Sequence, residues 1–529
     1  MARSTVTRPV IRAPVPGTAA DDQDMRRMHK PQELNRVYSV VTLVGYAVIV
    51  GLTWPFSLVT GTLSLTNGGP AGAIWVFLGV CFGMFMCVLS MAEMASIEPT
   101  TGGQYHWVSV FAPPKWQKPL SYFVGWMCAL GWQSYVPGAS NVGASAIQGF
   151  AVVASDTYVP EAWHIALLTI VICTCAILFN VYLARRLPGI EAAVFTIYIL
   201  AFVAFLIILL AMGSRSGPRY MFTHFEDNAG WGSIGSACFV GISGPVITLI
   251  GSDSAVHLAE ELKDASRQLP KAMLSTAGVN YLLGFLMLVA FIAVVGDVES
   301  VLATPTGQPY IQVIWNATQS RTATMVMVAF IIFFYIFCAV NQNTTSSRQL
   351  YAFARDGGLP FSGWISYVSP ERCIPVHAVF LTWFIACGLA LIPLGSTAAF
   401  INIQTIGNSG LLVSYMICIA SRLYHRNAVG PYGSLAKPPS FFLGKTLGNV
   451  VNSLAILFLI CFLVSGMFPV FPNPTVETMN WSSMALGSTL IIAIVSYVWL
   501  RKTYLGAGVG GSVELVDMEA DGKIFGRRG

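Results

Sequence analysis

Three ionisable side chains lie inside or at the edge of long apolar segments of this chain. They are Glu93, Asp253 and His257. An ionisable group inside a hydrocarbon layer is costly, so its default interpretation is a role in ion coupling or in gating. Glu93 and Asp253 lie toward the ends of their segments, where a gate or a packing contact fits as well as a proton relay.

The sequence contains no motif for covalent or metal chemistry. A nucleophile motif, a zinc-ligand spacing, a phosphate loop and a dinucleotide fingerprint are all missing. Gly102-Gly103 and Gly357-Gly358 follow no strand, which disfavours phosphate binding. We therefore expect no enzymatic activity, no cofactor and no metal.

The composition is that of an integral membrane protein. Of the 529 residues, 55% are hydrophobic and only 10% are charged, whereas soluble domains carry about 25% charged residues. Apolar runs long enough to cross about 30 Å of hydrocarbon recur along the chain. We predict an all-α fold of twelve transmembrane helices, at about 38–60, 71–96, 120–153, 163–183, 190–212, 233–259, 277–296, 324–346, 376–394, 397–421, 447–471 and 482–501.

Basic residues are distributed unevenly between the two sets of loops. Most of those near the membrane lie in alternate loops and in the adjoining tails, whereas the opposite loops carry Arg215, Arg219 and Arg321. Positively charged loops stay in the cytoplasm, so we predict that both termini are cytoplasmic. The net charge of +5 follows from this bias and needs no nucleic-acid partner.

Two of the predicted spans contain helix-breaking residues at matching places. The first span contains Gly45, Gly51 and Pro55, and the sixth contains Gly241-Ile-Ser-Gly-Pro245. Backbone groups that such a break frees must be buried or must line a cavity. Because the breaks are five spans apart, they predict a 5+5 inverted repeat with the substrate site of a secondary transporter between them.

The domain organisation follows from these spans. We expect a disordered cytoplasmic tail at 1–35, a twelve-helix transporter domain at 36–502 and a second cytoplasmic tail at 503–529. Within the domain, the first repeat covers about 36–212, the second covers about 233–421, and helices eleven and twelve cover about 447–501.

Aromatic and amide side chains near the middle of the spans are further candidates for ligand contact. Trp132 and Tyr135 lie in the third span, Tyr335 in the eighth and Asn408 in the tenth. An indole ring binds a cationic amine through its face. Packing between helices is the plainer interpretation of each of these residues.

Two glycosylation sequons fall in loops expected outside the cell, at Asn316 and Asn480. Cysteine is missing from those loops, so we expect no extracellular disulfide framework. Both observations agree with the predicted topology.

Three polar segments at cytoplasmic ends of spans carry a family resemblance. The second span ends in Glu93-Met-Ala-Ser-Ile-Glu-Pro-Thr-Thr-Gly-Gly-Gln-Tyr105, the sixth is followed by acidic residues and Arg267-Gln-Leu-Pro270, and the eighth by Arg348-Gln-Leu-Tyr-Ala-Phe-Ala-Arg-Asp-Gly-Gly-Leu-Pro360. These segments resemble those of the amino acid–polyamine–organocation superfamily. Gly103-Gln-Tyr-His-Trp107 and Leu120-Ser-Tyr-Phe-Val-Gly-Trp126 are similar to the fungal amino acid/choline permeases.

This resemblance implies the twelve-span inverted-repeat fold, alternating access and a proton gradient as the usual driving force. It places the substrate between the two breaks, so the main candidates for substrate contact are Ile49, Val50, Gly51, Leu52, Thr53, Phe239, Gly241, Ile242, Ser243 and Gly244. Span five has no lysine, so a lysine proton carrier of the kind found in some relatives is not visible.

Four functions remain open at this stage. We favour a proton-coupled permease for an amino acid or a related small amine, with the plasma membrane as its location. A choline or quaternary-amine permease, a non-transporting nutrient sensor and a channel are the alternatives. In each case the partners are a small molecule and the lipid bilayer.

Overall fold

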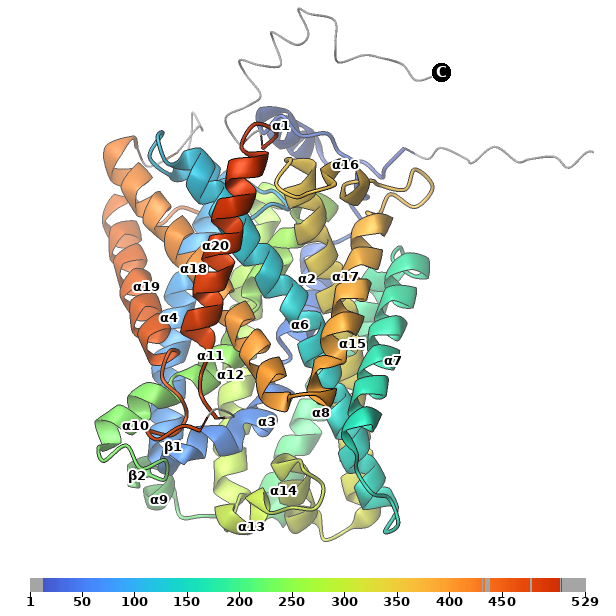
Figure 1. Cartoon of the computed structure of the whole chain (residues 1–529), viewed down its shortest axis with the longest axis vertical. Helices are drawn as coiled ribbons and strands as arrows, with labels where there is room; N and C mark the ends of the chain where they lie inside the picture. The colour runs from blue at the N-terminus through green and yellow to red at the C-terminus, as the bar shows by residue number, and fades with distance from the viewer. Residues whose placement is uncertain (1–12, 431, 433–437, 476–477, 505, 507–529) are drawn as a thin grey trace, which may run out of the picture.

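The computed structural model describes residues 13–430, 432, 438–475, 478–504 and 506. The described chain is a bundle of long helices (Figure 1). Its long and interrupted helices are α2 (Val40–Gly51), α3 (Thr53–Thr66), α4 (Gly69–Ile97), α6 (Gln117–Ala154), α7 (Ala162–Tyr182), α8 (Leu187–Met212), α10 (Ile234–Gly241), α11 (Ser243–Leu249), the 3₁₀ helix η1 (Ser252–Glu261), α12 (Ala265–Val294), α15 (Arg321–Arg355), α17 (Val376–Ala390), α18 (Thr397–Ala428), α19 (Lys445–Ser465) and α20 (Ser482–Leu500).

Short elements connect these helices on both faces of the bundle. They are α1 (Ala19–Arg27), α5 (Gln104–Phe111), α9 (Pro218–Thr223), α13 (Val298–Leu302), α14 (Pro309–Thr318), α16 (Ser362–Ile365), the 3₁₀ helix η2 (Ile392–Leu394), β1 (Asn67–Gly68) and β2 (Glu226–Asp227). The two strands pair antiparallel, with Asn67 opposite Asp227. This small ribbon joins the end of α3 to the segment before α10.

Eleven helical segments in the described part of the chain are long and apolar enough to cross a membrane. The third predicted span, α6, has 38 residues but is not among them. Its centre, from Gly131 to Ser145, is rich in glycine, serine and amide side chains. The predicted number of twelve is therefore not confirmed by length and apolarity alone, although α6 lies within the bundle (Figure 1).

The same order of elements occurs in both halves of the bundle. An interrupted span comes first (α2–α3 and α10–α11–η1), followed by a long helix (α4 and α12), a short connecting helix (α5 and α14) and another long helix (α6 and α15). Two further spans complete each half (α7, α8 and α17, α18). When α6 is counted as a span, each half has five, so the second half enters from the opposite face, as the predicted 5+5 inverted repeat requires.

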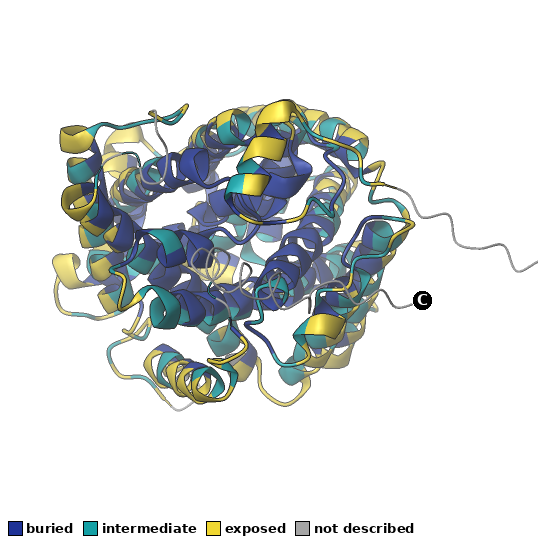
Figure 2. Cartoon of the chain, turned by 90° about the horizontal axis from the view of Figure 1, so that it is seen from above, coloured by how far each residue is buried: buried dark blue, intermediate teal, exposed yellow. Residues whose placement is uncertain are grey.

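Apolar residues occupy both the inside and the rim of the bundle. Figure 2 shows buried helices at the centre and exposed residues at the periphery. Large exposed side chains on the outer helices are apolar, among them Leu200, Ile207, Phe384 and Trp499. An apolar belt of this kind is stable against lipid tails and would aggregate in water.

The first span breaks where the sequence predicts. Helix α2 ends at Gly51, Leu52 has left-handed dihedral angles (φ 44°, ψ 39°), and α3 starts at Thr53. A non-glycine residue rarely adopts this conformation, so the surrounding packing must hold it.

The break in the sixth span lies further along the chain than predicted. Ile242 separates α10 from α11 but keeps helical angles (φ −57°, ψ −33°), and the Val246 N–H still donates to the Ile242 carbonyl at 3.3 Å. Pro245 stands in the first turn of α11, where a missing N–H costs little. The backbone leaves the helix at Ile250 (ψ 156°) and Gly251 (φ 113°).

The segment before the first span differs from the disordered tail expected over 1–35. Residues 19–27 form α1, and Asp21 accepts hydrogen bonds from the backbone N–H groups of Asp264 and Ala265 at 2.9 Å, which caps α12. Burial alone would raise the pKa of Asp21, but the N–H groups of Ala265 and Thr18 and the charge of Arg36 hold it below its ordinary value. Residues 1–12 and 507–529 lie outside the described residues.

Glu93 holds three helices together. Its carboxylate, on α4, forms ion pairs with Arg422 at 3.1 Å and with Arg426, both on α18. Gly448 on α19 lies against the Arg426 guanidinium. A Cβ on Gly448 would lie 2.4 Å from the Arg426 Cζ. All three charged side chains are buried.

We expect Glu93→Gln to destabilise the protein strongly. The change removes the negative charge that two buried guanidinium groups face, and breaking a buried ion pair from one side costs about 3–5 kcal/mol. The measurement is the thermal unfolding midpoint of the purified protein in detergent. The matched control is Glu299→Gln, because Glu299 is an exposed acid on α13. Equal midpoints for the two variants would contradict the structural role of Glu93.

Candidate functional site

A pocket of about 370 Å³ lies between the two helix breaks. Val50, Gly51 and Leu52 line it from the first break, and Ile250 and Gly251 line it from the second. It extends from there to the first residues of α7 and of α18, on the side of the two breaks that faces away from α1 (Figure 1). The pocket therefore reaches from mid-depth toward one face of the bundle.

The first break supplies backbone groups that are not used up by helix formation. The Val50 carbonyl faces α15, where the Cys338 thiol (3.4 Å) and the Gln342 amide (3.5 Å) donate to it. The Trp54 N–H, in the first turn of α3, donates to the Tyr198 hydroxyl at 3.4 Å. No side chain caps α3, so its N-terminal end keeps partial positive charge.

Glycine is required where the two breaks approach each other. A Cβ on Gly251 would lie 3.7 Å from the Gly51 Cα, and Gly251 has a positive φ of 113° that other residues rarely adopt. A Cβ on Gly51 would lie 2.6 Å from the Asn280 amide nitrogen. Gly251 is therefore required by its backbone conformation, and Gly51 by the close approach of the Asn280 side chain.

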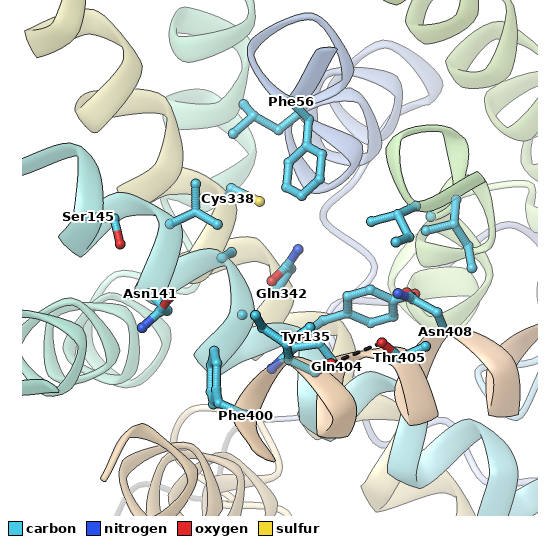
Figure 3. A pocket seen from close by; sticks show the side chains of 18 of the residues that line it. Phe56, Tyr135, Asn141, Ser145, Cys338, Gln342, Phe400, Gln404, Thr405 and Asn408 are labelled. Carbon is cyan, nitrogen blue, oxygen red and sulfur yellow. Dashed lines mark hydrogen bonds between the residues drawn. The ribbon is translucent and has the colours of Figure 1, made fainter. Parts of the chain in front are cut away.

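Neutral polar and aromatic side chains complete the pocket. The Tyr135 hydroxyl on α6 donates to Asn408 Oδ1 on α18 at 2.5 Å. Figure 3 shows Phe56, Tyr135 and Gln342 around the same space, with α3, α6 and α15 as their sources. The wider part adds Asn141, Ser145, Phe400, Gln404 and Thr405.

No acidic or basic side chain is among the described residues that line this pocket. A ligand with a net charge would therefore lose its hydration without gaining a counter-charge. The charges available to a ligand are the partial charges of the helix ends. This arrangement suits a molecule whose own positive and negative groups balance.

Asp253 and His257 lie between the pocket and the face of the bundle that carries α1. The Trp132 ring separates them from it, with its centroid 5.5 Å from that of His257. Asp253 accepts from the Gln104 amide at 2.8 Å and lies 3.8 Å from His257 Nε2. His257 Nδ1 lies 3.0 Å from the Thr101 carbonyl. The group thus joins η1 to the segment between α4 and α5.

Ion pairs close the bundle between Asp253 and His257 and the face that carries α1. Glu260 binds Arg355 through two contacts of 2.8 Å, and Glu261 binds Arg348 at 2.8 Å. Segment 13–38 adds pairs of Arg27 with Glu98 (2.6 Å) and Lys30 with Asp356 (3.2 Å). The pocket is open toward one face and sealed toward the other.

The predicted substrate-contact residues divide into three groups. Six of them line the pocket: Val50, Gly51, Leu52, Trp132, Tyr135 and Asn408. Ile49, Thr53 and Tyr335 are buried beside it without lining it. Phe239, Gly241, Ile242, Ser243 and Gly244 lie away from it, because the break they were expected to form is at Ile250–Gly251. Gly241 and Gly244 instead pack against Asn67 and Ser64.

Sequence reasoning missed several residues of the site. Phe56, Ile247 and Gln404 line the pocket, and nothing in their local sequence distinguishes them from packed residues. Gly251 was the one local signal for the second break, and a lone glycine is a weak signal. Glu191 was also missed: it lies at the start of the fifth span and is fully buried.

The two sequons lie in different environments. Asn316 is exposed on α14. Asn480 donates its side-chain nitrogen to the carbonyl oxygens of Gly466 (2.7 Å) and Phe468 (2.9 Å). That nitrogen is the atom to which a glycan is attached, so Asn316 is the more accessible of the two sites.

An inverted repeat with a mid-depth pocket between two interrupted helices defines a secondary transporter. The amino acid permease family matches residues 37–496 of this chain, and the chain belongs to that family. It is therefore a multi-pass transmembrane transporter for small molecules rather than an enzyme.

Individual relatives agree with this assignment. A putative amino acid/polyamine transporter of Macrophomina phaseolina is 31% identical, over 84% of this chain and 97% of its own length. The choline transporter and the GABA-specific permease of Saccharomyces cerevisiae are 26% and 27% identical, over 89% and 92% of this chain and 82% and 85% of their own. The crystal structure of a manganese transporter mutant from Eremococcus coleocola shares the fold, with a TM-score of 0.54, 11% identity and coverage of 87% of this chain and 94% of its own.

A cysteine in the pocket should react from one face of the membrane only. We expect Asn141→Cys to be labelled by a membrane-impermeant thiol reagent added to the face opposite α1, because Asn141 lines the open part of the pocket. The measurement is the mass increase relative to the parent chain. The adjacent Ser140→Cys is the matched control, since Ser140 is fully buried. Equal labelling of both variants would contradict the open pocket.

Proposed function

We propose that this chain is a proton-coupled symporter that imports an amino acid or a related small zwitterionic amine by alternating access. The observation that supports this proposal is the pocket itself. It lies between two helix breaks and is lined by aliphatic, aromatic and neutral polar side chains, without an acid or a base among its described residues. A zwitterion carries its own charge balance into such a site.

The helix ends provide a binding mode for both charged groups of a zwitterion. A carboxylate is attracted to the N-terminal end of α3, beyond Leu52, and an ammonium group to the carbonyl end of α2, where Val50 lies. Trp132 and Tyr135 then flank the carbon skeleton, and Asn408 orients the Tyr135 hydroxyl. Specificity for the length of the substrate would depend on the polar residues farther from the breaks, such as Asn141 and Gln404.

Choline or another quaternary amine is the second candidate. Trp132, Tyr135 and Phe56 offer aromatic faces to a cation, and one relative is named a choline transporter. A permanent cation would need a counter-charge in a desolvated site, and the described lining offers none. The charge balance therefore favours the zwitterion, in agreement with the relative named a GABA-specific permease.

We assign the ionisable residues of η1, on the closed side of the pocket, to gating. Asp253 and His257 join η1 to the α4–α5 segment, and the Glu260 and Glu261 ion pairs join η1 to α15. Alternating access requires these contacts to separate when the other face opens. Glu93, which is held between two arginines, acts as a fixed support for α18 during that movement.

We place both termini in the cytoplasm of a cell whose plasma membrane holds the protein. The face that carries α1 also carries most of the basic residues near the membrane, in accord with the positive-inside rule. Asn316 on the opposite face is the proposed glycosylation site.

Uptake in a permease-deficient yeast tests the proposed function. We expect one compound of a radiolabelled panel (GABA, choline and a mixture of amino acids) to accumulate, and a protonophore to abolish the accumulation. The control is the same strain without the permease. If the protein is at the cell surface and nothing enters, the importer proposal fails. Uptake of choline alone would contradict the proposal of a zwitterionic substrate and favour the second candidate.

The Tyr135 hydroxyl should contribute to substrate affinity. We expect Tyr135→Phe to raise the KM for the transported compound by roughly fivefold with little change in maximal rate, because a hydrogen bond contributes about 1 kcal/mol. The measurement is the concentration dependence of initial uptake. Tyr220→Phe, on α9 outside the pocket, is the control. An unchanged KM in Tyr135→Phe would exclude this hydroxyl from binding.

A further inference from the structure

Glu191 is a buried acid that has no cationic partner among the described residues. It lies near the start of α8, a 26-residue apolar span, and is fully buried. Its Oε2 accepts a hydrogen bond from the Asn341 amide nitrogen at 2.8 Å, and its Oε1 has no hydrogen-bond partner among the described residues. In contrast, Glu93, Glu260 and Glu261 each form an ion pair with arginine.

The groups around Glu191 do not neutralise a negative charge. Helices α2, α12, α14 and α15 pack against α8. The titratable and charged groups on these helices are Tyr46 (α2), Tyr281, Arg267 and Lys271 (α12), Tyr310 (α14), and Arg321, Tyr335, Cys338, Arg348, Tyr351 and Arg355 (α15). Arg348 and Arg355 are paired with glutamates, and Arg267 and Lys271 are exposed in the first two turns of α12.

A carboxylate in this position is unstable unless it takes up a proton. Removing an ionised carboxylate from water costs many kcal/mol when no opposite charge compensates it, and the group avoids that cost by becoming neutral. The single hydrogen bond from Asn341 compensates only part of it. Asn341 Oδ1 has no hydrogen-bond partner among the described residues. If the Asn341 amide rotates, this oxygen can accept a hydrogen bond from a protonated Glu191.

Asn341 connects Glu191 to the first helix break. Its amide nitrogen also lies 3.4 Å from the Tyr46 carbonyl, and the Tyr46 hydroxyl donates to the Asn341 carbonyl at 2.7 Å. One residue further along α15, Gln342 lines the pocket and donates to the Val50 carbonyl at 3.5 Å. Cys338, one turn earlier, donates to the same carbonyl at 3.4 Å. One turn of α15 thus contacts both Glu191 and the substrate pocket.

We propose that Glu191 is the proton-binding site of this carrier and that Asn341 transmits its protonation state to the break at Val50–Leu52, an inference that rests on the proton-coupled symport proposed above. The carboxylate takes up a proton, which gives a neutral carboxylic acid. It releases the same proton to water on the other side of the membrane after the carrier has changed its conformation. The ionised form accepts from Asn341, and the protonated form donates to it.

Infrared spectroscopy tests proton binding without a substrate. We expect the purified full-length protein in lipid to show the carbonyl band of a protonated carboxylic acid that decreases as the pH is raised, and we expect Glu191→Gln to lose this band. Asn341→Ala keeps Glu191 but removes its partner, so the band should shift in frequency. A titrating band that persists unchanged in both variants overturns the proposal, as does a spectrum in which no such band titrates.

Transport in proteoliposomes tests the coupling. The probe is radiolabelled GABA, with a pH-sensitive dye inside the vesicles. We expect Glu191→Gln to keep GABA counterflow but to lose GABA-driven proton entry, Glu191→Asp to retain some proton entry, and Glu299→Gln to behave as the wild type. Proton entry that persists in Glu191→Gln overturns the role of Glu191 and leaves the symporter intact. A wild type that exchanges GABA without moving protons refutes the coupling itself.

Discussion

The structure depends on one constraint: backbone polar groups that leave a helix inside a membrane must find other partners. The left-handed Leu52 frees the Val50 carbonyl, which receives donors from Cys338 and Gln342 on α15. The N-terminal end of α3 is supported by Tyr198 on α8. The break is therefore stable only within the assembled bundle, and the pocket is the space that these partners leave for a ligand.

The two faces of the bundle are built from different interactions. Toward the open face, the pocket is surrounded by aliphatic, aromatic and neutral polar side chains. Toward the closed face, buried ion pairs join η1, α15, the α4–α5 segment and the chain before α2. Ion pairs of this kind contribute little net stability compared with apolar packing, but they fix one geometry precisely. They suit contacts that a carrier must form and release in turn.

Charge is kept out of the pocket and placed around it. Asp253 and His257 lie behind the Trp132 ring, and Glu191 lies behind Asn341. A substrate therefore meets partial charges of helix ends, which bind a zwitterion without trapping it. Because the substrate pocket and Glu191 are separate sites, a substrate and a proton can bind or leave without competing for the same groups. The turn of α15 from Cys338 to Gln342 connects the two sites.

The sequence by itself determined the membrane class, most of the spans, the inverted repeat and the first break, because apolar runs and glycine–proline clusters act locally on the backbone. It also predicted Trp132, Tyr135 and Asn408, which line the pocket. Only the tertiary structure decided that the second break lies at Ile250–Gly251, since Pro245 fits the first turn of a helix and a lone glycine is a weak signal. The same is true of Gln342 and Glu191, whose roles come from neighbours about 150 or more residues away along the chain, and such proximity leaves no local pattern.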